Sequence, residues 1–570
     1  MKAGGPSLAG RGTDIRKLNG QVYTPLPVAR QMLDMVSWPL GHEDGVLLDP
    51  ACGDGVFLEA AIHKVLGLSI SAAKKKEIIG DRLRGWDLDP SAVSACRERL
   101  RSVVGEMGAG AKLPSLEVRN ALVPSSETFA CVIGNPPYLE AKRMPDDLKA
   151  LVRRFRPLAA KGAFDLYTAF IELACGLTEP DGDICLLIPN RFLVVSYAEE
   201  LRRRLLATRH VRVTDLSEQK IFDAAVYPII LEARPKATSK GHGSASYTVL
   251  PTVTSRKGVA LRSRVLLDRL GGIMPVAPTH EGGRRLLKRV LTEKYLSPLS
   301  RHLLIRWTVS FHKAGLRDRY VYSEPAHDMK RPRRFLGGGR FQGNREISAY
   351  RISWNGSWID YDTERAKNEG NPLPPLELFE KPKLVICQNA RRARCAIDEN
   401  GYVLKDTFLA GILEREKDGL LEWLCLVLNS DVVHYVYEHL YGGTRKGGGY
   451  LHFLSRYLSP LPVPPMPDAS KVLPIHEILA DSSKHEPANE RDANASRGTG
   501  LTFARSVRPS FQEARQAAEK LVREAYGVTA FERRALESYS FPSPHSQRSR
   551  RPGRSITSAR GNTESLSSSS

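Results

Sequence analysis

The chain has 570 residues, which is too long for one compact hydrophobic core, so we expect two large domains and smaller pieces. Its formal net charge of +21 is typical of a protein with a polyanionic partner, although a solvated basic surface would give the same balance. No run is long and apolar enough to span a bilayer, and the N-terminus lacks the apolar core of a signal peptide. These features exclude a membrane-spanning protein and predict a cytoplasmic one.

The eight cysteines are scattered through mostly apolar runs. They form no CxxC pair and no Cys/His cluster with zinc-ligand spacing, so we expect buried thiols and no metal site.

From about Tyr23 to Ala233, short apolar runs alternate with helical stretches, a pattern that predicts a doubly wound, mostly parallel, Rossmann-like α/β sheet. We expect strands at Gly45–Asp49, Leu83–Asp87, Leu116–Arg119, Phe129–Ile133, Asp183–Ile188, Val211–Leu216 and Tyr227–Ala233. We expect helices at Phe57–Val65 and Ser91–Val103.

The turn Asp49-Pro50-Ala51-Cys52-Gly53-Asp54-Gly55 follows the first strand. Glycine lets the backbone pass close to a ligand, and Asp49 and Asp54 flank the turn with carboxylates. An acidic turn repels a pyrophosphate but suits the ammonium and sulfonium of S-adenosylmethionine, which favours that cofactor over NAD. The second strand ends at Asp87, where an acid would grip a ribose diol. A plain tight turn and a plain strand end are the simpler alternatives.

The fourth strand ends in Asn135-Pro136-Pro137-Tyr138. An exocyclic amine on a nucleobase is a poor nucleophile, because its lone pair is delocalised into the ring. The Asn135 side chain and the Pro136 carbonyl could accept its two N–H bonds, the prolines stiffen the loop, and Tyr138 offers a flat face for the base. A base in a duplex reaches such a pocket only when it is flipped out. An ordinary proline-rich turn is the alternative.

The order Val22-Tyr23-Thr24-Pro25, DPACGDG, GWDLDP and NPPY resembles the N6-adenine DNA methyltransferases of the gamma arrangement, typified by the TaqI and Eco57I methylases. The resemblance covers residues 20–235 strongly and 295–467 more diffusely. It implies that the chain transfers a methyl group from S-adenosylmethionine to adenine N6 in duplex DNA, at a specific site, in a prokaryotic restriction-modification or phage-defence system.

The resemblance also assigns roles to single residues. Tyr23 and Thr24 would close over the methionine part of the cofactor, and Asp165 would belong to a helix lining the cofactor pocket. Phe222 would clamp the flipped adenine opposite Tyr138, with Tyr227 as the second candidate and an ordinary core Phe as the alternative. The family usually has Asp where this chain has Asn120, which keeps an acceptor oxygen for the cofactor adenine.

The region 296–467 mixes aromatic and β-branched residues with Arg, Lys and Gly, which predicts a mixed α+β target-recognition domain like that of the TaqI group. Arginine is the commonest reader of base edges, yet most basic residues contact phosphate. The candidate DNA-binding residues are Arg333, Arg334, Arg340, Arg391, Arg392, Arg394, Arg445 and Lys446.

The remaining segments are predicted from composition and capping signals. We expect a disordered N-terminus over 1–20, a methyltransferase domain over 21–235 and a linker or surface excursion over 236–295. A polar linker over 468–509 would precede a helical segment over 510–542, with Gly527 as a C-terminal cap and Thr529 and Glu532 in a capping box. Residues 543–570 are rich in Ser and Arg and are predicted to be disordered.

Three other readings stay open. The same Asn-Pro-Pro-Tyr corner serves enzymes that methylate RNA adenine or a protein glutamine amide, and a DNA-recognition subunit without activity could keep the fold. Cytosine-C5 methylation is excluded because no Pro-Cys dipeptide supplies its nucleophile. We expect double-stranded DNA as the partner, a separately encoded restriction endonuclease or none, and a monomer.

Overall fold

The structure is a computed structural model. It describes residues 24–40, 44–216, 227–235, 246–250, 258–311, 315–325, 329–337, 346–444, 450–481 and 509–539. The predictions made for Tyr23, Phe222, Arg340, Arg445, Lys446 and the segments 1–20 and 543–570 lie outside these residues.

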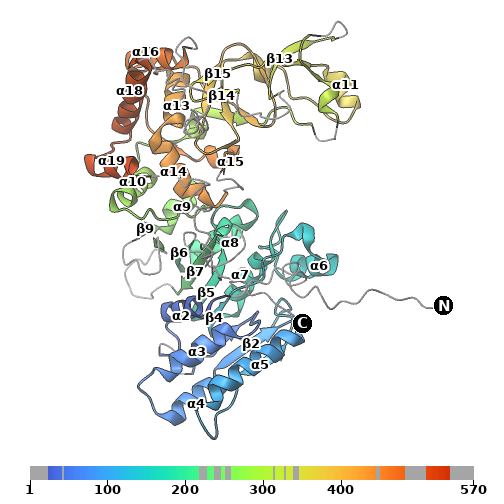
Figure 1. Ribbon diagram of the computed structural model, residues 1–570, viewed down its shortest axis with the longest axis vertical. Coiled ribbons are helices and arrows are strands. Elements are labelled where there is room, and N and C mark those ends of the chain that lie inside the picture. The colour runs from blue at the N-terminus through green and yellow to red at the C-terminus, as the bar shows by residue number, and fades with distance from the viewer. Residues whose placement is uncertain are drawn as a thin grey trace, which may run out of the picture.

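A nine-stranded sheet forms the centre of the N-terminal part, which occupies the lower half of Figure 1. In spatial order its strands are β3 (Ser115–Val118), β2 (Leu83–Asp87), β1 (Leu47–Asp49), β4 (Phe129–Gly134), β5 (Thr178–Pro189), β7 (Pro228–Arg234), β6 (His210–Asp215), β8 (Ser246–Leu250) and β9 (Val259–Arg262). The first five are parallel, whereas β7 is antiparallel to both β5 and β6. The predicted doubly wound α/β fold is therefore confirmed, with a mixed second half of the sheet.

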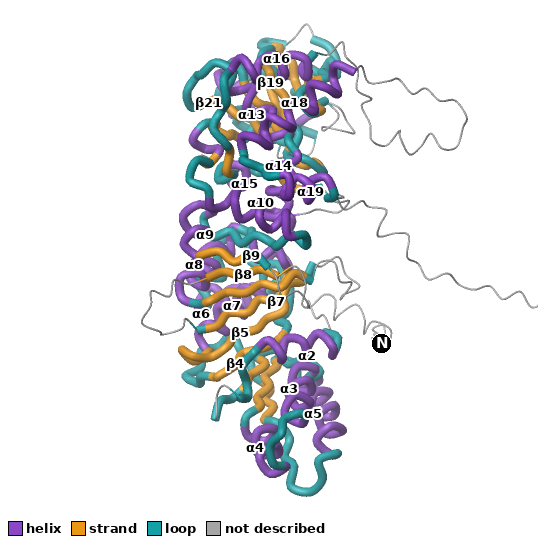
Figure 2. Tube along the Cα trace, turned by 90° about the vertical axis from the view of Figure 1, so that its left-hand side faces the viewer, coloured by secondary structure: helices purple, strands orange, loops and turns teal. Residues whose placement is uncertain are grey.

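Helices cover both faces of this sheet. The helices of the N-terminal part are α2 (Leu26–Met35), α3 (Val56–Leu66), α4 (Ala72–Asp81), α5 (Pro90–Gly105), α6 (Asp146–Phe155), α7 (Leu166–Leu177) and α8 (Glu199–Thr208). In Figure 2, α3 and α5 lie on one side of the strands, and α6 and α8 lie on the other. Neighbouring strand residues alternate between the faces: Leu47 packs into the cluster that holds α2 to α5, and Leu48 into the cluster that holds α7 and α8.

The C-terminal part, at the top of Figure 1, contains two four-stranded sheets. One is antiparallel, in the order β11 (Leu303–Arg306), β21 (Phe408–Leu413), β17 (Lys383–Cys387) and β19 (Cys395–Asp398). The other has the order β12 (Val321–Tyr322), β16 (Trp358–Asp360), β13 (Pro332–Leu336) and β20 (Val403–Leu404). Short strand pairs are β10 (Ser297–Pro298) with β23 (Pro462–Val463), β14 (Ile347–Ser348) with β15 (Arg351–Ile352), and β18 (Asn389–Ala390) with β22 (Leu451–His452).

Helices from distant parts of the chain surround these sheets. They are α10 (Glu281–Thr292), α11 (Thr363–Asn368), α12 (Glu377–Glu380), α13 (Leu420–Asn429), α14 (Asp431–Tyr441), α15 (Ser455–Leu458), α16 (Ala469–Ala480), α18 (Pro509–Ala525) and α19 (Ala530–Glu537). The apolar side of α18, with Phe511, Ala518 and Val522, is buried in the main core. The expected C-terminal helices thus pack onto the C-terminal part.

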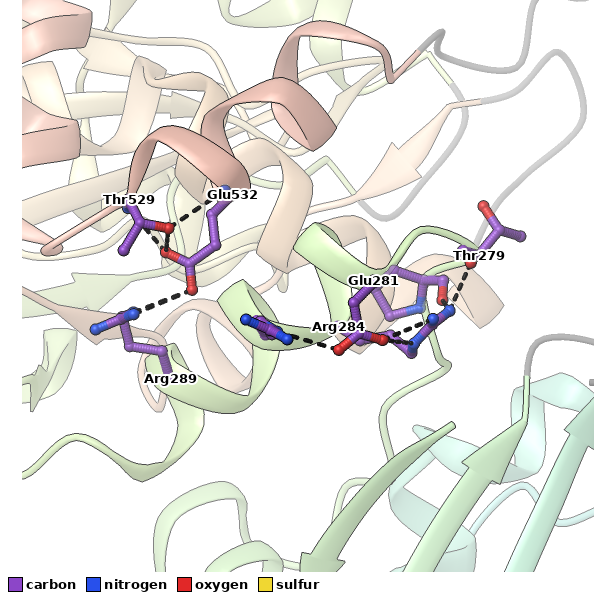
Figure 3. Close-up of polar contacts among 8 residues, drawn as sticks. Thr279, Glu281, Arg284, Arg289, Thr529 and Glu532 are labelled. Carbon is purple, nitrogen blue, oxygen red and sulfur yellow. Dashed lines mark hydrogen bonds and ion pairs between the residues drawn. The ribbon is translucent and has the colours of Figure 1, made fainter. Parts of the chain in front are cut away.

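The last helix is fixed by a buried carboxylate. The predicted capping box is confirmed: the Glu532 backbone N–H donates to the Thr529 hydroxyl, and the Thr529 backbone N–H donates to the Glu532 carboxylate. Glu532 is 1% exposed and also forms an ion pair with Arg289 of α10 at 3.2 Å (Figure 3). One side chain therefore caps α19 and docks it on α10.

Two linker predictions are corrected. The segment 236–295 contains β8 and β9, which extend the sheet, followed by α9 (Ser263–Leu270) and α10. Both strands are short and follow a polar stretch rich in Ser, Lys and Gly, which hides them in the sequence. The segment 468–509 begins with α16, which Asp468 caps by accepting from the Ser470 N–H. Among the described residues, no helix combines the length and apolar character that a membrane crossing requires.

Candidate active site

The Asp49–Gly55 turn connects β1 to α3 at the carboxyl edge of the sheet. Gly53 and Gly55 both have positive φ angles, +53° and +89°. A Cβ on Gly55 would lie 2.5 Å from Cys96 Sγ, so a larger residue would be both strained and crowded. The backbone conformation of this turn therefore favours glycine at both positions, as the sequence predicted.

Asp87 at the tip of β2 fastens this turn. Its Oδ2 accepts from the Gly53 N–H at 2.9 Å, and its Oδ1 accepts from the Asp89 N–H at 2.9 Å. The Cys52 N–H donates to the Trp86 carbonyl at 2.9 Å. The carboxylate predicted to hold a ribose therefore lies against the glycine turn, in the place where a nucleoside would cross from one strand to the next.

Asp49 is buried at the end of β1, with 1% of its surface exposed. Its Oδ1 accepts from the Ala51 N–H at 3.1 Å, while its Oδ2 has no hydrogen-bond partner among the described residues. Burial raises the pKa of Asp49 to about 8, against a smaller opposing effect of that N–H. A buried carboxyl with one unmatched oxygen suits a cationic ligand, which would restore the charged form.

Asp54, the other acid of the turn, does not face the same way. Its carboxylate forms an ion pair with Arg99 of α5 at 2.6 Å, and Arg99 also holds Glu59 at 2.6 Å. The acids that remain at the carboxyl edge are Asp49 and Asp87, because Asp54 serves to dock α5 on the turn.

Asn120 follows β3, whose last pairs lie beside the tip of β2. Its Oδ1 accepts from the Leu122 N–H at 3.1 Å, which closes a local turn, and its side chain is half-buried. The neighbouring Arg119 guanidinium lies 3.9 Å from the centre of the Trp86 ring. The structure thus places Asn120 next to Asp87 at one edge, and its contact with a cofactor adenine stays a prediction.

The Asn135–Tyr138 loop leaves β4 at the same edge. The Asn135 side-chain amide donates to the Thr24 hydroxyl at 3.1 Å, and Thr24 is 7% exposed. This contact brings the segment before α2 onto the loop. Gly134, immediately before Asn135, packs against the acid of β1, because a Cβ there would lie 2.6 Å from Asp49 Oδ1. The acidic turn and the Asn-Pro-Pro-Tyr corner are therefore adjacent.

The Tyr138 ring is held from two sides. Its hydroxyl donates to the Leu187 carbonyl of β5 at 3.0 Å, and its ring meets Tyr167 edge-on at 6.1 Å between centroids. Burial raises the pKa of the Tyr138 phenol well above its usual range, so the group stays neutral. Pro136 is buried and Pro137 half-buried beside it, which keeps the corner rigid.

Asp165, which the resemblance assigns to a helix lining the cofactor pocket, contacts the same loop. It precedes α7, is 4% exposed, and accepts from the Leu139 N–H at 2.9 Å. Burial raises the pKa of Asp165 above its usual value. Its position next to the loop is consistent with the cofactor edge, but the contact it makes positions Leu139 and hence Tyr138.

Three further residues of this edge were not foreseen. Gly134 permits the approach of Asp49, and the only sequence signal is its place directly before Asn135. Arg191, in a 3-10 helix η2 (Asn190–Leu193), forms an ion pair with Glu140 at 3.3 Å. Glu140 follows β4 and Arg191 follows β5, and these two strands are parallel neighbours. That adjacency was the sequence signal that could have placed the two side chains together.

The predicted DNA-binding arginines of the C-terminal part have different surroundings. Arg333 and Arg334 lie on β13, where Arg334 stacks on Trp354 at 5.2 Å, and Arg391 stacks on Tyr450 at 5.6 Å. Arg392 pairs with Asp431 at the start of α14, and the Arg394 carbonyl accepts from the Cys387 N–H. Arg334 and Arg391 are exposed, whereas Arg392 is half-buried in its ion pair with Asp431.

The C-terminal part reaches the carboxyl edge of the sheet through a glycine pair, Gly442 and Gly443. Gly443, in a 3-10 helix η6 (Gly442–Thr444) after α14, packs against η2: a Cβ there would lie 3.0 Å from the Asn190 carbonyl oxygen. The two parts of the molecule therefore meet next to Arg191 and the Asn135–Tyr138 loop.

Family models match three segments of the chain. The Eco57I restriction-modification methylase model matches residues 108–222, and the TaqI-like C-terminal specificity domain model matches residues 341–463. The RMKL-like methyltransferase domain model matches residues 16–163. The first segment contains the Asn135–Tyr138 corner, and the third contains both the glycine turn and the corner. The second contains the candidates Arg391, Arg392, Arg394, Arg445 and Lys446, whereas Arg333, Arg334 and Arg340 precede it.

Similar proteins are type II methyltransferases of bacteria. M.BstVI of Geobacillus stearothermophilus is 30% identical over 259 residues, which cover 41% of this chain and 46% of that protein. M.TthHB8I of Thermus thermophilus is 28% identical over 206 residues, covering 35% of this chain and 41% of that protein. The chain thus spans less than half the length of these relatives.

A solved structure supports the architecture. The type IIL restriction-modification enzyme MmeI in complex with DNA has a TM-score of 0.51 and 14% identity, and the superposition covers 90% of this chain and 74% of that one. This likeness concerns the fold. By sequence, the chain is TaqI/Eco57I-like, with an N-terminal methylase region and a TaqI-like C-terminal specificity domain, as the resemblance of its motifs predicted.

Proposed function

We propose that this chain is a site-specific DNA methyltransferase that moves a methyl group from S-adenosylmethionine to N6 of an adenine flipped out of duplex DNA, in a restriction-modification or phage-defence setting. One observation carries the proposal. The buried acid Asp49 and the Asn135 corner are neighbours, because Gly134 lets the Asp49 carboxylate lie against the residue that precedes Asn135.

The residues of the edge fit S-adenosylmethionine. Asp49 offers a buried carboxylate oxygen without a partner among the described residues, which matches a cationic group. Gly53 and Gly55 leave no side chain above the turn, Asp87 would hold the ribose hydroxyls, and Asn120 would face the adenine. When bound, the cofactor would supply a methyl carbon attached to a positively charged sulfur. Transfer of that methyl group does not require a metal, because the neutral thioether is a good leaving group.

Asn135 and Pro136 would activate the acceptor. Two oxygens, Asn135 Oδ1 and the Pro136 carbonyl, would accept the N–H bonds of the adenine amine and bring its lone pair out of the ring plane. The hydrogen bond from Asn135 Nδ2 to Thr24 fixes which end of the amide turns toward the amine. In this arrangement the adenine nitrogen would form its bond to the methyl carbon as the C–S bond breaks with its electron pair left on sulfur, and one N6 proton would leave to solvent.

Tyr138 would receive the base. A neutral phenol that donates to Leu187 cannot swing away, so its ring presents a fixed face. Base stacking on such a ring contributes about 1–3 kcal/mol, and this offsets the few kcal/mol that extrusion costs.

The decisive test supplies the purified chain with S-adenosylmethionine labelled in its methyl group. Duplex DNA, RNA hairpins and a glutamine-containing peptide are offered separately, and the product nucleoside or residue is identified by mass spectrometry. The proposal predicts label in DNA as N6-methyladenine. Label in RNA or in the peptide would favour methylation of RNA adenine or of a glutamine amide. Cofactor binding without any transfer would favour a recognition subunit without activity.

A further inference from the structure

A short excursion of the chain begins at the catalytic corner and returns to it. Tyr138 is followed by Leu139 and Glu140, and the chain comes back at Phe164 and Asp165. The Ala141 N–H donates to the Phe164 carbonyl at 2.8 Å, the Leu166 N–H donates to the Leu139 carbonyl at 3.0 Å, and Glu140 forms a β-bridge with Asp165. The two ends of the excursion, residues 141–163, are thus held together by hydrogen bonds directly after the loop that carries Tyr138.

This excursion is strongly basic. It contains seven Lys and Arg residues against two Asp, in a chain whose net charge is +21 over 570 residues. The cations are Lys142, Arg143, Lys149, Arg153, Arg154, Arg156 and Lys161. The recognition candidates of the C-terminal part do not include this cluster, although it directly follows the Asn-Pro-Pro-Tyr motif.

Three of these cations have no acidic partner. Lys142 pairs with Glu140 at 2.6 Å and Lys149 with Asp146 at 2.9 Å. Arg143, Arg153 and Arg154 are exposed, and none of them forms an ion pair within the described part of the chain. Helix α6 buries Val152 and half-buries Leu148 and Leu151, which directs Arg153 and Arg154 outward.

The charged side chains at the two ends of the excursion form ion pairs, whereas the arginines on its outer face do not. Glu140 holds both Lys142 and Arg191, so the charges nearest to Tyr138 are compensated. The uncompensated arginines begin at Arg143 and continue on α6, which lies on the other side of the strands from α3 and α5 in Figure 2. Such an arrangement leaves a cationic surface beside, and not inside, the reacting corner.

We propose that Arg143, Arg153 and Arg154 form a phosphate-binding surface that grips the DNA backbone next to the extruded nucleotide; this inference rests on the proposed function. Helix α6 has ten residues and is therefore about 15 Å long, which is about four base-pair steps of about 3.4 Å. Because the excursion is anchored two residues after Tyr138, the phosphates it reaches belong to the nucleotides around the target base. Phosphate contacts position the duplex and carry no sequence information.

The test removes three charges and measures salt dependence. The variant Arg143→Gln/Arg153→Gln/Arg154→Gln is compared with the control Arg97→Gln/Arg101→Gln/Lys112→Gln, which removes the same number of charges from α5 and the segment after it. Figure 2 shows α5 on the other side of the strands from α6, and Lys112 is paired with Asp81 at 4.0 Å. Binding is measured with a short duplex that carries the motif found by sequencing methylated DNA. Each lost phosphate contact lowers the slope of log Kd against log salt by about 0.9, so the affinity change between about 50 and about 200 mM salt should shrink about 40-fold in the variant.

The control triple should keep the wild-type slope, and both triples should keep the wild-type affinity for S-adenosylmethionine and the same methylated motif. An unchanged slope of log Kd against log salt in the α6 variant, or an equal decrease in the control, would contradict the proposed phosphate-binding surface. If the wild type transfers no methyl group to DNA, the proposed function fails; if it does transfer while the slopes agree, only this inference fails.

A second measurement leaves the protein unaltered. Single phosphates around the target adenine are replaced by neutral methylphosphonates, and the wild type and the α6 variant are compared on each duplex. The proposal predicts positions where neutralisation weakens wild-type binding and has no further effect on the variant. A set of flanking positions without any effect on the wild type contradicts the proposal.

Discussion

The carboxyl edge of the N-terminal sheet and the specificity region place their functional side chains in different ways. At the edge, Asp49 and Asp87 end strands and accept from backbone N–H groups of the glycine turn, and Asn135 directly follows β4 and donates to the Thr24 hydroxyl. In the specificity region, Arg334 and Arg391 rest on aromatic rings, and Arg392 reaches Asp431 across a helix boundary. The residues proposed for the reaction thus lie in or beside turns, and the residues proposed for DNA contact are long side chains on packed elements.

This difference separates two kinds of failure. A change at the edge should stop chemistry and leave the selected DNA sequence unaltered, because turn geometry sets the reaction. A change on the specificity surface should alter DNA binding while the rate of bound complexes stays the same. The substitutions that follow test this separation, beginning with the largest expected effect.

Asn135→Ala removes the side chain that would accept the adenine amine. We expect methyl transfer in a single turnover to fall about 100- to 1000-fold, because one preorganised polar contact to the reacting group is lost. Cofactor affinity, measured by calorimetry, should stay within a few-fold of wild type. Wild-type transfer by this variant would mean that another group activates the amine.

Asp49→Asn tests the buried acid through pH. Because its pKa is raised to about 8, Asp49 is protonated as pH falls, and a cationic ligand loses its counter-charge. Cofactor affinity should therefore weaken about 30-fold between about pH 7 and about pH 5.5 in the wild type, close to one decade per pH unit. In Asp49→Asn the affinity should be low and independent of pH.

The same raised pKa has a consequence for folding. A carboxyl whose pKa is higher in the folded protein than the usual 3.8 makes the fold less stable as pH rises from about 4 to about 8. Unfolding of the cofactor-free protein should show this loss in the wild type and a smaller loss in Asp49→Asn. An equal pH dependence in both proteins would place the titrating group elsewhere.

Gly134→Ala tests the contact between the two halves of the edge. A Cβ at Gly134 would lie 2.6 Å from Asp49 Oδ1, so the fold should lose about 1–3 kcal/mol through overpacking, with weaker cofactor binding. The control is Gly176→Ala on α7, where a Cβ meets nothing within 4 Å and alanine should stabilise the helix by about 1 kcal/mol. Equal effects of the two changes on cofactor binding would contradict the packing.

Arg392→Gln gives the smallest expected effect. Its ion pair with Asp431 is partly exposed, so unfolding free energy should fall by about 1 kcal/mol or less, as urea titration would report. Arg391→Gln, the neighbouring exposed arginine on Tyr450, should instead weaken DNA binding and leave stability unchanged. The reverse pattern would exchange the roles of the two arginines.

Sequence patterns predicted the parts of the fold that local chemistry controls. The strand Leu83–Asp87 and the capping box at Thr529 and Glu532 are confirmed because each depends on a few consecutive residues. The order of β7 and β6 and the additional strands β8 and β9 were not predicted, since pairing between distant segments leaves little trace in one sequence.

The candidate site shows the same limit. The positions of Asp49, Asp87 and Asn135 at one edge follow from the parallel strands that they end or directly follow. The ion pair between Asp54 and Arg99 and the hydrogen bond from Leu139 to Asp165 could not be predicted, because each joins residues that the motifs treat separately. The roles of Tyr23 and Phe222 stay predictions, since both lie outside the described residues.

The most direct measurement is single-molecule sequencing of DNA from cells that express the wild-type chain or Asn135→Ala. The account predicts N6-methyladenine at one short sequence motif in the first culture and none above background in the second. Unmodified DNA from the wild type, a modified cytosine, or the same adenine mark in both cultures would contradict it.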